Sequence, residues 1–276
     1  MARSARVAFT KMCGTGNDFI IIDNREGLLK EGLPELAKRL CARPTSIGGD
    51  GLILVESVQG ADFFMRVFNP DGTEPAMCGN GARCVARYAA LKKIAQPEMT
   101  FDTIAGQLTA TVKGSRVKLR MTDPKDLRLD VQIVDEKREI SADFVDTGVP
   151  HVVLFADDLE KVEVDELGRM IRYHKLFSPA GTNVNFVSRG ENNRLAIRTY
   201  ERGVEAETLA CGTGSTAAAV IAGLRGYVKS PVEVRTRGED TLRIYFRRSG
   251  DTLTDVYLEG ETRVIYEGAL HREAFL

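Results

Sequence analysis

The sequence has few of the residues that mark specialised protein classes. Cysteine occurs five times in 276 residues, histidine three times and tryptophan not at all. Five thiols are sparse for a disulfide scaffold, and their number is odd. His151, His174 and His271 are too scattered to supply the closely spaced ligands of a zinc site. We therefore expect reduced thiols and no bound metal.

An excess of charge of either sign and long apolar runs are also missing. The chain has 38 basic and 39 acidic residues, a balance that gives no reason to expect a nucleic-acid or anionic-membrane partner. No apolar run approaches the roughly 18 residues that span a bilayer, and the basic N-terminus lacks the apolar stretch of a secretory signal. A cytoplasmic globular protein is the expectation. At about 150 residues per domain, the length favours two domains.

Short β-branched and aromatic runs between turn signals predict a sheet-rich α+β fold. The predicted strands are 7–12, 19–23, 51–56, 63–68, 99–103, 108–112, 117–121, 144–146, 152–155, 185–188, 195–200, 232–236, 241–246, 254–258 and 263–266, and the predicted helices are 34–40, 79–94, 165–174 and 212–224. The Asp123-Pro124 step and the charged residues after it favour a linker. We expect an N-terminal domain of residues 1–123, joined by the last ten or so residues, and a C-terminal domain of residues 124–266.

The two halves of the chain contain similar segments. Residues 68–82 read FNPDGTEPAMCGNGA, and residues 200–215 read YERGVEAETLACGTGS. Each predicts a strand, a turn glycine, an acidic residue, then Cys-Gly-x-Gly and a helix. This repeat predicts two pseudo-symmetric domains, each a mixed, mostly antiparallel sheet or barrel around a central helix. Cys78 and Cys211 occupy equivalent places at the helix N-termini.

The start of a helix is a favourable place for a reactive thiol. Backbone N–H groups are unpaired in the first turn, and the macrodipole is positive there. Both effects lower the pKa of a cysteine, so that a thiolate is accessible near neutral pH. The neighbouring glycines let an anion such as a carboxylate approach the backbone amides.

Two thiols of this kind suit the inversion of a stereocentre. One group must remove a proton from one face of the carbon, and a second group must deliver a proton to the other face. A thiolate and a thiol can do this and exchange roles for the opposite enantiomer. Donors to the substrate carboxylate would stabilise the charge that develops. We expect the active site in a cleft between the two domains, where closure excludes water.

The motifs together resemble the diaminopimelate epimerase family over nearly the whole chain. They are FTKM at 9–12, GNDF at 16–19, the segment from FN at 68–69 to CGNGARC at 78–84, TGVPH at 147–151, GTNVNF at 181–186, and the segment from YERG at 200–203 to ACGTGS at 210–215. Members of this family interconvert LL- and meso-diaminopimelate without a cofactor, in lysine and peptidoglycan precursor biosynthesis. The resemblance also implies a homodimer.

The resemblance implies a role for each matching residue. Cys78 and Cys211 would be the acid–base pair, with Cys78 the donor and Cys211 the acceptor for the LL substrate. His151 and Glu201 would tune the two thiols. The implied substrate-binding set is Asn17, Asn69, Gly79, Asn80, Asn183, Glu201, Arg202, Gly212, Thr213 and Ser215. Amides, a carboxylate and a guanidinium suit a substrate that is zwitterionic at both ends.

Some positions are not settled by the motifs. Asn185 lies two residues after Asn183 on one predicted strand, so the two would share a face and pattern alone does not separate them. Gly51 and Val149 stand where some family members have Gln and Asn, and we expect backbone groups or water to replace those contacts. Cys84 is expected to face the protein interior from its helix and to pack in the core, and Cys41 is expected at the end of a short helix.

Two other functions are compatible with paired cysteines. Proline or hydroxyproline racemases use two-cysteine chemistry but lack the YERG and GNDF pairings found here. A thiol redox or peroxide-sensing protein could use Cys78 and Cys211 as a dithiol, but the chain has no Cys-x-x-Cys motif. Epimerisation of diaminopimelate is the leading hypothesis.

Overall fold

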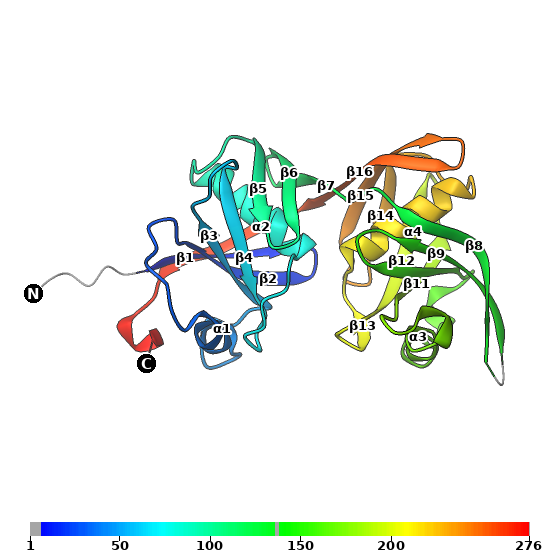
Figure 1. Ribbon diagram of the computed structural model, residues 1–276, viewed down its shortest axis with the longest axis horizontal. Coiled ribbons are helices and arrows are strands. Elements are labelled where there is room, and N and C mark those ends of the chain that lie inside the picture. Colours follow the sequence, from blue (N-terminus) through cyan, green and yellow to red (C-terminus); the bar gives the residue numbers. More distant parts are fainter. Residues whose placement is uncertain (1–6, 136–137, 276) are drawn as a thin grey trace, which may run out of the picture. The chain divides into compact units, whose positions relative to one another are not determined.

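The computed structural model describes residues 7–135 and 138–275. Contacts divide the chain into unit 1, Met1–Leu119 with Gly260–Leu276, and unit 2, Arg120–Glu259. Each unit contains strands and helices (Figure 1). Residues 1–6, the start of the basic N-terminus, lie outside the described residues. In the described part of the chain, no helix is both long and apolar enough to cross a membrane.

Unit 1 is a mixed sheet with two principal helices. Its elements are β1 (Ala8–Gly14), β2 (Asn17–Asp23), α1 (Leu33–Cys41), β3 (Gly51–Glu56), β4 (Phe63–Phe68), α2 (Gly79–Leu91), β5 (Glu98–Thr103), β6 (Gly106–Lys113), β7 (Arg116–Arg120), β17 (Arg263–Ala269) and the 3₁₀-helix Arg272–Phe275. Strand β1 pairs antiparallel with both β17 and β2. The β2–β3 and β4–β5 pairs are parallel, whereas β3–β4, β5–β6 and β6–β7 are antiparallel.

Unit 2 repeats this succession of pairings. Its elements are β8 (Lys125–Val134), β9 (Glu139–Asp146), β10 (Pro150–Phe155), α3 (Val164–Arg172), β11 (Asn183–Arg189), β12 (Arg194–Glu201), β13 (Ala206–Thr208), α4 (Gly212–Leu224), β14 (Val232–Arg235), β15 (Thr241–Ser249) and β16 (Thr252–Glu261), with 3₁₀-helices at Leu159–Lys161 and Lys175–Phe177. The β10–β11 and β12–β14 pairs are parallel. The β8–β9, β9–β10, β11–β12, β14–β15 and β15–β16 pairs are antiparallel.

In both units a helix connects the two strands of each parallel pair. Helix α1 connects β2 to β3 as α3 connects β10 to β11, and α2 connects β4 to β5 as α4 lies between β12 and β14. A parallel pair needs such a crossover, because its strands run in the same direction. The predicted α+β fold of two similar halves is therefore confirmed.

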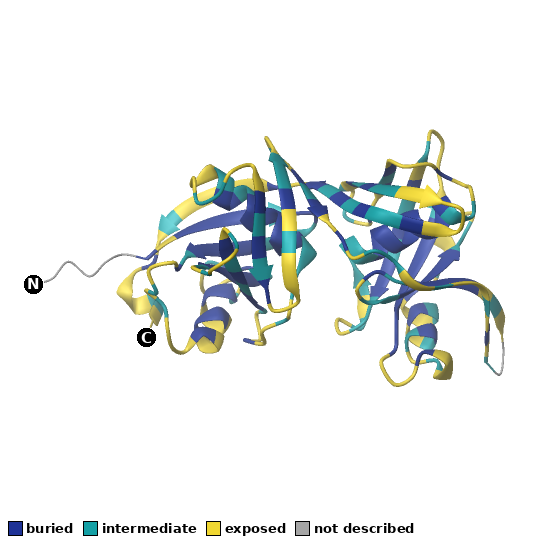
Figure 2. Ribbon diagram, turned by 45° about the horizontal axis from the view of Figure 1, so that its top comes forward, coloured by how far each residue is buried: buried dark blue, intermediate teal, exposed yellow. Residues whose placement is uncertain are grey.

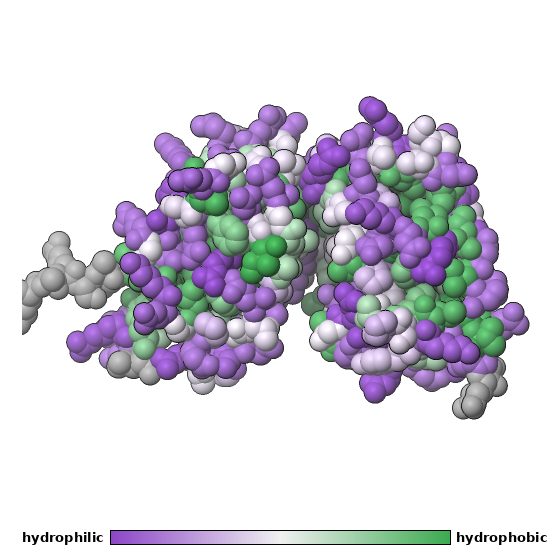
Figure 3. Space-filling view, viewed as in Figure 1, coloured by the Kyte–Doolittle hydropathy of each residue, from purple (hydrophilic) through white to green (hydrophobic). Residues whose placement is uncertain are grey.

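Helices α2 and α4 are the central helices of their units. Helix α2 packs against β1, β2, β3, β4 and β6, and α4 packs against β9, β10, β11, β12, β14 and β15. Residues 214–223 of α4 are all buried, and much of this helix is dark blue in Figure 2. A helix that is buried all round belongs to a core. Hydrophilic side chains cover most of the face shown in Figure 3.

Local chemistry explains where the first hairpin turns. Thr15 and Gly16 both have positive φ, and the β1–β2 register closes at Gly14 opposite Asn17. Two residues with positive φ form the primed turns that match the twist of paired strands. The turn therefore places Asn17 at the first position of β2.

The observed elements differ from the sequence predictions most clearly at the end of α2 and after Pro124. Helix α2 ends at Leu91 and not at residue 94, because Lys93 takes a left-handed backbone conformation with φ 57°. The charged stretch after Pro124, which we interpreted as a linker, is strand β8. Its residues are mostly exposed, so charged side chains are tolerated there. The alternation of apolar and polar residues that indicates a half-buried strand is therefore weak in this segment.

Candidate functional site

The two cysteines of the repeat have the same place in their units. Cys78 is the N-cap of α2, with φ −137° and ψ 114°, and Cys211 is the N-cap of α4, with φ −123° and ψ 112°. Each of these helices has 13 residues. The N-cap residue is extended while the following residues are helical. Both thiols therefore stand beside the unpaired amides of a first helical turn.

The start of α2 rests on a polar network within unit 1. The Asn80 amide donates to Asn17 Oδ1 at 2.6 Å and to the Thr15 carbonyl at 3.2 Å. The Asn80 Oδ1 accepts from Arg83 at 2.7 Å, and the same guanidinium reaches Thr15 Oγ1 at 2.7 Å. The Asn17 amide in turn donates to Asp50 at 3.0 Å. The network joins β2 to the first turn of α2.

This network determines which groups of the Cys78 turn are available to bind a ligand. Both amide hydrogens of Asn80 are used by Thr15 and Asn17, so Asn80 offers a ligand its backbone and not its side-chain donors. A Cβ added at Gly79 would meet no atom within 4 Å. The chain beside Cys78 therefore faces open space. Arg83, a fully buried residue of the network, was missed by the sequence analysis although it lies inside the quoted motif.

Cys211 is held by hydrogen bonds within its own turn. Its Sγ lies 3.4 Å from the Gly214 N–H that donates to it and 3.5 Å from Thr213 Oγ1. The Ser215 hydroxyl donates to the Cys211 carbonyl at 2.9 Å and is fully buried. The Thr147 hydroxyl donates to the Thr213 carbonyl at 3.2 Å. These bonds fix the sulfur relative to the first turn of α4.

The acidity of Cys211 is opposite to the sequence expectation. Burial raises the pKa of the Cys211 thiol to about 12, and the Glu201 carboxylate adds to the rise. The hydrogen bonds from Thr213 and Gly214 act in the other direction but do not compensate. Only 7% of the Cys211 surface is exposed. The expected lowering of the pKa is therefore wrong for Cys211, because desolvation disfavours the thiolate more than the helix start favours it.

Glu201 is a half-buried carboxyl at the end of β12. The Thr208 hydroxyl donates to its Oε2 at 3.0 Å. Burial raises the pKa of Glu201, and the Thr208 bond only partly opposes this rise. A carboxylate with a raised pKa is a better proton acceptor than an ordinary one. Glu201 is therefore suited to accept the proton of the Cys211 thiol. The negative charge of Glu201 in turn raises the pKa of this thiol.

His151 is fully buried on β10 and is neutral. Burial and the nearby Arg202 guanidinium lower the pKa of His151 to about 3. Its Nδ1 lies 3.1 Å from the Asn185 side-chain nitrogen. Its Nε2 is buried and has no hydrogen-bond partner among the described residues. The sequence pattern does not separate Asn185 from Asn183, but in the structure Asn185 contacts the predicted site residue His151 directly.

Asn183 supports the turn that carries Arg202. Its Nδ2 donates to the Pro150 carbonyl at 3.0 Å, and its Oδ1 accepts from the Arg202 backbone N–H at 2.9 Å. The Arg202 side chain bonds the Ala180 carbonyl at 3.2 Å and is partly exposed. Asn183 is 4% exposed, so it positions the Arg202 backbone from within the protein.

Other positions are explained by their immediate neighbours. Asn69 follows β4, and its amide donates to Thr73 Oγ1 at 2.9 Å within the same turn. A Cβ at Gly51 would lie 3.0 Å from the Phe68 carbonyl and 3.2 Å from the Phe19 ring. This close packing explains why no larger residue occupies position 51. Val149 is half-buried in the turn before β10.

Two of the remaining cysteines are core residues, as expected. Cys84 is fully buried in α2, and burial raises the pKa of its thiol to about 12. Cys41 is buried at the end of α1, and burial raises its pKa to about 11. Cys13 is partly exposed on β1. The raised pKa values keep the Cys84 and Cys41 thiols protonated at neutral pH.

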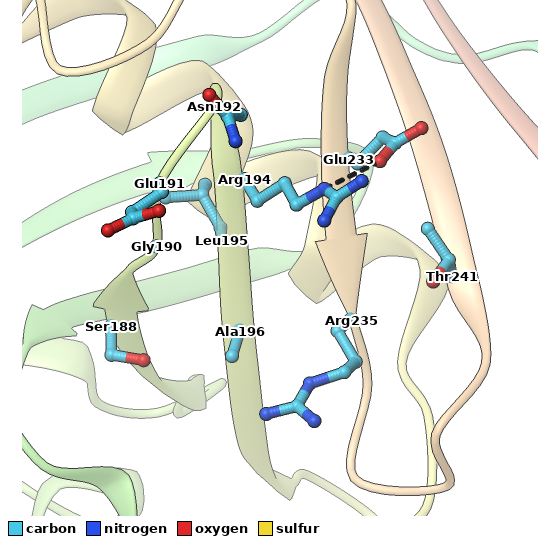
Figure 4. A pocket seen from close by; sticks show the side chains of 10 residues that line it. All are labelled: Ser188, Gly190, Glu191, Asn192, Arg194, Leu195, Ala196, Glu233, Arg235 and Thr241. Atoms are coloured by element: carbon cyan, nitrogen blue, oxygen red, sulfur yellow. Dashed lines mark hydrogen bonds and ion pairs between the residues drawn. The ribbon is translucent and has the colours of Figure 1, made fainter.

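A separate groove of about 560 Å³ lies on unit 2 between the β11–β12 turn, β14 and β15. Figure 4 shows Arg194 reaching across it to Glu233, and the Nε–Oε2 distance is 3.1 Å. None of the predicted site residues lines this groove. An exposed ion pair of this kind contributes little binding energy by itself, so we assign the groove no catalytic role.

Comparison with known proteins identifies the family. The family model described as diaminopimelate epimerase matches residues 9–127 and 144–264. The chain belongs to the diaminopimelate epimerase family. A curated diaminopimelate epimerase from Hydrogenobaculum sp. (strain Y04AAS1) is 44% identical over 96% of this chain and 99% of its own length. A second, from Aquifex aeolicus (strain VF5), is 43% identical over 96% and 98%.

Solved structures with little sequence similarity share the fold. A phenazine biosynthesis protein of the PhzF family from Bacillus anthracis has a TM-score of 0.74 at 16% identity, over 96% of this chain and 99% of that one. A hydroxyproline epimerase from Agrobacterium vitis has a TM-score of 0.70 at 17% identity, over 98% of this chain and 94% of that one.

Diaminopimelate epimerases are isomerases. Membership of this family therefore makes the chain an enzyme of that class.

Proposed function

We propose that the chain interconverts LL-2,6-diaminopimelate and meso-diaminopimelate by moving a proton at one α-carbon between two cysteines, without a cofactor. The observation that carries the proposal is the matched pair of N-cap cysteines on helices of equal length in two units of the same topology. Inversion needs a proton donor and a proton acceptor on opposite faces of one carbon. One thiol from each unit meets that need.

Glu201 supplies a route for the proton that Cys211 carries in the resting state. The raised pKa of Cys211 means that this residue rests as a thiol. Before it accepts the α-proton of the LL substrate, its own proton passes to the Glu201 carboxylate, giving a Cys211 thiolate and a Glu201 carboxylic acid. The thiolate then takes the α-proton while the Cys78 thiol gives its proton to the other face. In the reverse direction the two cysteines exchange roles.

The substrate carboxylate beside the reacting carbon is bound by backbone donors in this proposal. The amides at Gly79, Asn80, Gly212 and Thr213 belong to the first turns of two helices, where N–H groups favour an anion. As the α-proton leaves, negative charge moves onto this carboxylate, and the same donors bind it more strongly. Ser215 acts here by fixing the Cys211 turn through its bond to the Cys211 carbonyl.

The distal amino-acid end of the substrate requires polar side chains. We propose Asn17, Asn69 and Arg202 for its ammonium and carboxylate groups, with Asn183 holding the Arg202 turn. Arg202 is partly exposed, and a guanidinium pairs with a carboxylate through two parallel bonds. Proline has no such distal group, and this distinguishes the proposal from a proline or hydroxyproline racemase.

The cellular setting and assembly are part of the proposal. We propose a cytoplasmic enzyme that acts in lysine and peptidoglycan precursor synthesis as a homodimer. Val264, Ile265 and Tyr266 on β17 are 38%, 53% and 44% exposed. Consecutive exposed apolar residues on a strand favour contact with another protein surface, and a second copy of the chain would cover them.

Incubation of purified protein with LL-diaminopimelate and no added cofactor tests this function. We expect the meso isomer to accumulate toward an equilibrium mixture, measured by chiral chromatography, and we expect L-proline and hydroxyproline to remain unchanged. Racemisation of proline with no conversion of diaminopimelate would replace this proposal by the racemase alternative. Consumption of peroxide without any isomerisation would favour a redox function.

A further inference from the structure

We propose that Asn185 is a positioning residue that fixes the proton of His151 on Nε2, so that His151 presents a neutral N–H donor to the site and does not carry protons. The inference deepens the proposed function, on which its activity readout rests. It begins from the hydrogen bonds of two buried side chains on neighbouring strands, β10 and β11. Both side chains belong to unit 2, and both residues are fully buried.

The Asn185 carboxamide has a single orientation. Its Nδ2 donates to the Val152 backbone carbonyl at 2.9 Å, and a carbonyl can only accept. Its Oδ1 accepts from the Thr199 hydroxyl at 3.0 Å, on the paired strand β12. Exchanging the amide nitrogen and oxygen would leave two acceptors facing each other at Val152. The backbone therefore determines which amide atom faces His151.

This orientation determines the tautomer of the imidazole. The second Nδ2 hydrogen of Asn185 points at His151 Nδ1, and the two nitrogens are 3.1 Å apart. A proton on Nδ1 would face this amide hydrogen, donor against donor, so Nδ1 must accept. In the neutral ring the proton is then on Nε2. Burial and Arg202, the charged group that acts on the ring, both oppose the doubly protonated form.

The proton on Nε2 has no acceptor among the described residues. The Nε2 atom is buried and makes no hydrogen bond. A buried N–H without a partner costs free energy, on the order of 1–3 kcal/mol in typical cases, and such groups are rare in native proteins. A thiolate formed beside it would satisfy it, as would a substrate carboxylate oxygen that displaces the atoms covering Nε2. His151 would then act on an anion by donating a hydrogen bond.

The same carboxamide also packs against the Cys211 turn. A Cβ at Gly214 would lie 2.3 Å from Asn185 Oδ1 and 3.3 Å from Cys211 Sγ. Position 214 must therefore be glycine for Asn185 and the start of α4 to be neighbours. Asn185 connects the imidazole donor on β10 with the turn that holds the Cys211 thiol. Displacing this side chain would move both groups.

Ring nitrogen NMR tests the tautomer in the intact protein without substrate. The chain has three histidines, so ¹⁵N labelling of histidine gives few signals, which His174→Gln and His271→Gln variants assign. We expect a protonated, pyrrole-type Nε2 and an unprotonated, pyridine-type Nδ1 for His151, unchanged from about pH 8 to pH 5. A protonated Nδ1 in wild-type protein, or titration of the ring in this range, would overturn the inference.

Substitution of Asn185 then tests the link to activity. Asn185→Asp replaces the donor by an acceptor, so His151 should take up a proton on Nδ1, and kcat should fall by about 10²-fold. The matched control is Asn192→Asp, the same chemical change at an exposed position on the β11–β12 turn, which should leave kcat and the His151 signals unaltered. Full activity with a switched tautomer would also refute the positioning role.

The two readouts separate this inference from the proposed function. If the protein does not act on diaminopimelate but His151 has the Nε2–H tautomer, the proposed function fails and the assignment of the proton stands. If the protein epimerises diaminopimelate and His151 carries its proton on Nδ1, the proposed function stands and the role of Asn185 fails.

Discussion

Replacing either Cys78 or Cys211 by alanine should lower kcat for epimerisation by about 10⁴-fold, the upper end of what a positioned acid–base group contributes. Each variant leaves one face of the α-carbon without its proton donor or acceptor, so the remaining thiol cannot complete an inversion. Chiral chromatography of the products measures the loss. Both variants should stay folded, because loss of a capping bond such as that from the Gly214 N–H to Cys211 costs only about 1 kcal/mol.

The matched control is Cys13→Ala. Cys13 is a partly exposed thiol on β1 that has no place in the proposed mechanism. Its removal should keep kcat within about twofold, the usual range for a substitution outside a critical contact. If Cys13→Ala were as inactive as the Cys78 variant, or if either repeat cysteine could be removed without loss, the two-thiol mechanism would be wrong.

Glu201→Gln should separate activity from stability. The amide keeps the size of the side chain and can still accept from Thr208, but it cannot take the Cys211 proton. We expect kcat to fall by about 10²- to 10⁴-fold. The pKa of the Cys211 thiol should also fall, because Glu201 is one of the groups that raise it. Thiol alkylation rates as a function of pH measure this second effect.

The stability of the same variant should change in the opposite direction. Burial raises the folded-state pKa of Glu201 above its ordinary value of 4.5. The stabilisation from its proton is therefore complete below about pH 4.5 and is lost as pH rises through the folded-state pKa. At neutral pH the buried charge disfavours folding, and Gln removes it. Thermal unfolding at pH 7 should give a Tm equal to or above that of the wild type.

Glu191→Gln is the control for both measurements. Glu191 is exposed on the β11–β12 turn, and the same carboxyl-to-amide change there should alter neither kcat nor Tm. A Glu201→Gln variant that loses activity together with stability would indicate a structural role for Glu201. A fully active Glu201→Gln variant would exclude it as the acceptor of the Cys211 proton.

Sequence patterns predicted the elements that carry the cysteines because strong local signals coincide there. Helix α4 spans Gly212–Leu224 as predicted, since helix-forming residues follow a Cys-Gly-x-Gly turn. Strand β8 was missed because its exposed charged residues follow the pattern of a loop. The end of α2 was missed because it depends on the left-handed backbone conformation of Lys93. Such a conformation is usually indicated by glycine or asparagine and not by lysine.

The motifs place Asn80 in the turn after Cys78 and Thr213 in the turn after Cys211, but they do not show what each side chain does. Asn80 and Asn183 were expected to contact substrate, but their side chains bond the protein itself. Asn185 has the same residue type as Asn183 and the same strand face, and only its bonds to Val152 and His151 distinguish it. The pKa of Cys211 could not be predicted either, because it depends on burial.

Heavy water provides the most direct test of the central claim that two different groups serve the two faces of one carbon. LL-diaminopimelate should be incubated in heavy water with the wild-type enzyme, and both isomers should be isolated early, before the product reverts. We predict that the meso product carries one deuterium at the inverted α-carbon, while the recovered LL substrate keeps protium, as analysed by mass spectrometry. A meso product that retains the substrate's own hydrogen would show that a single group moves the proton, and it would contradict the account.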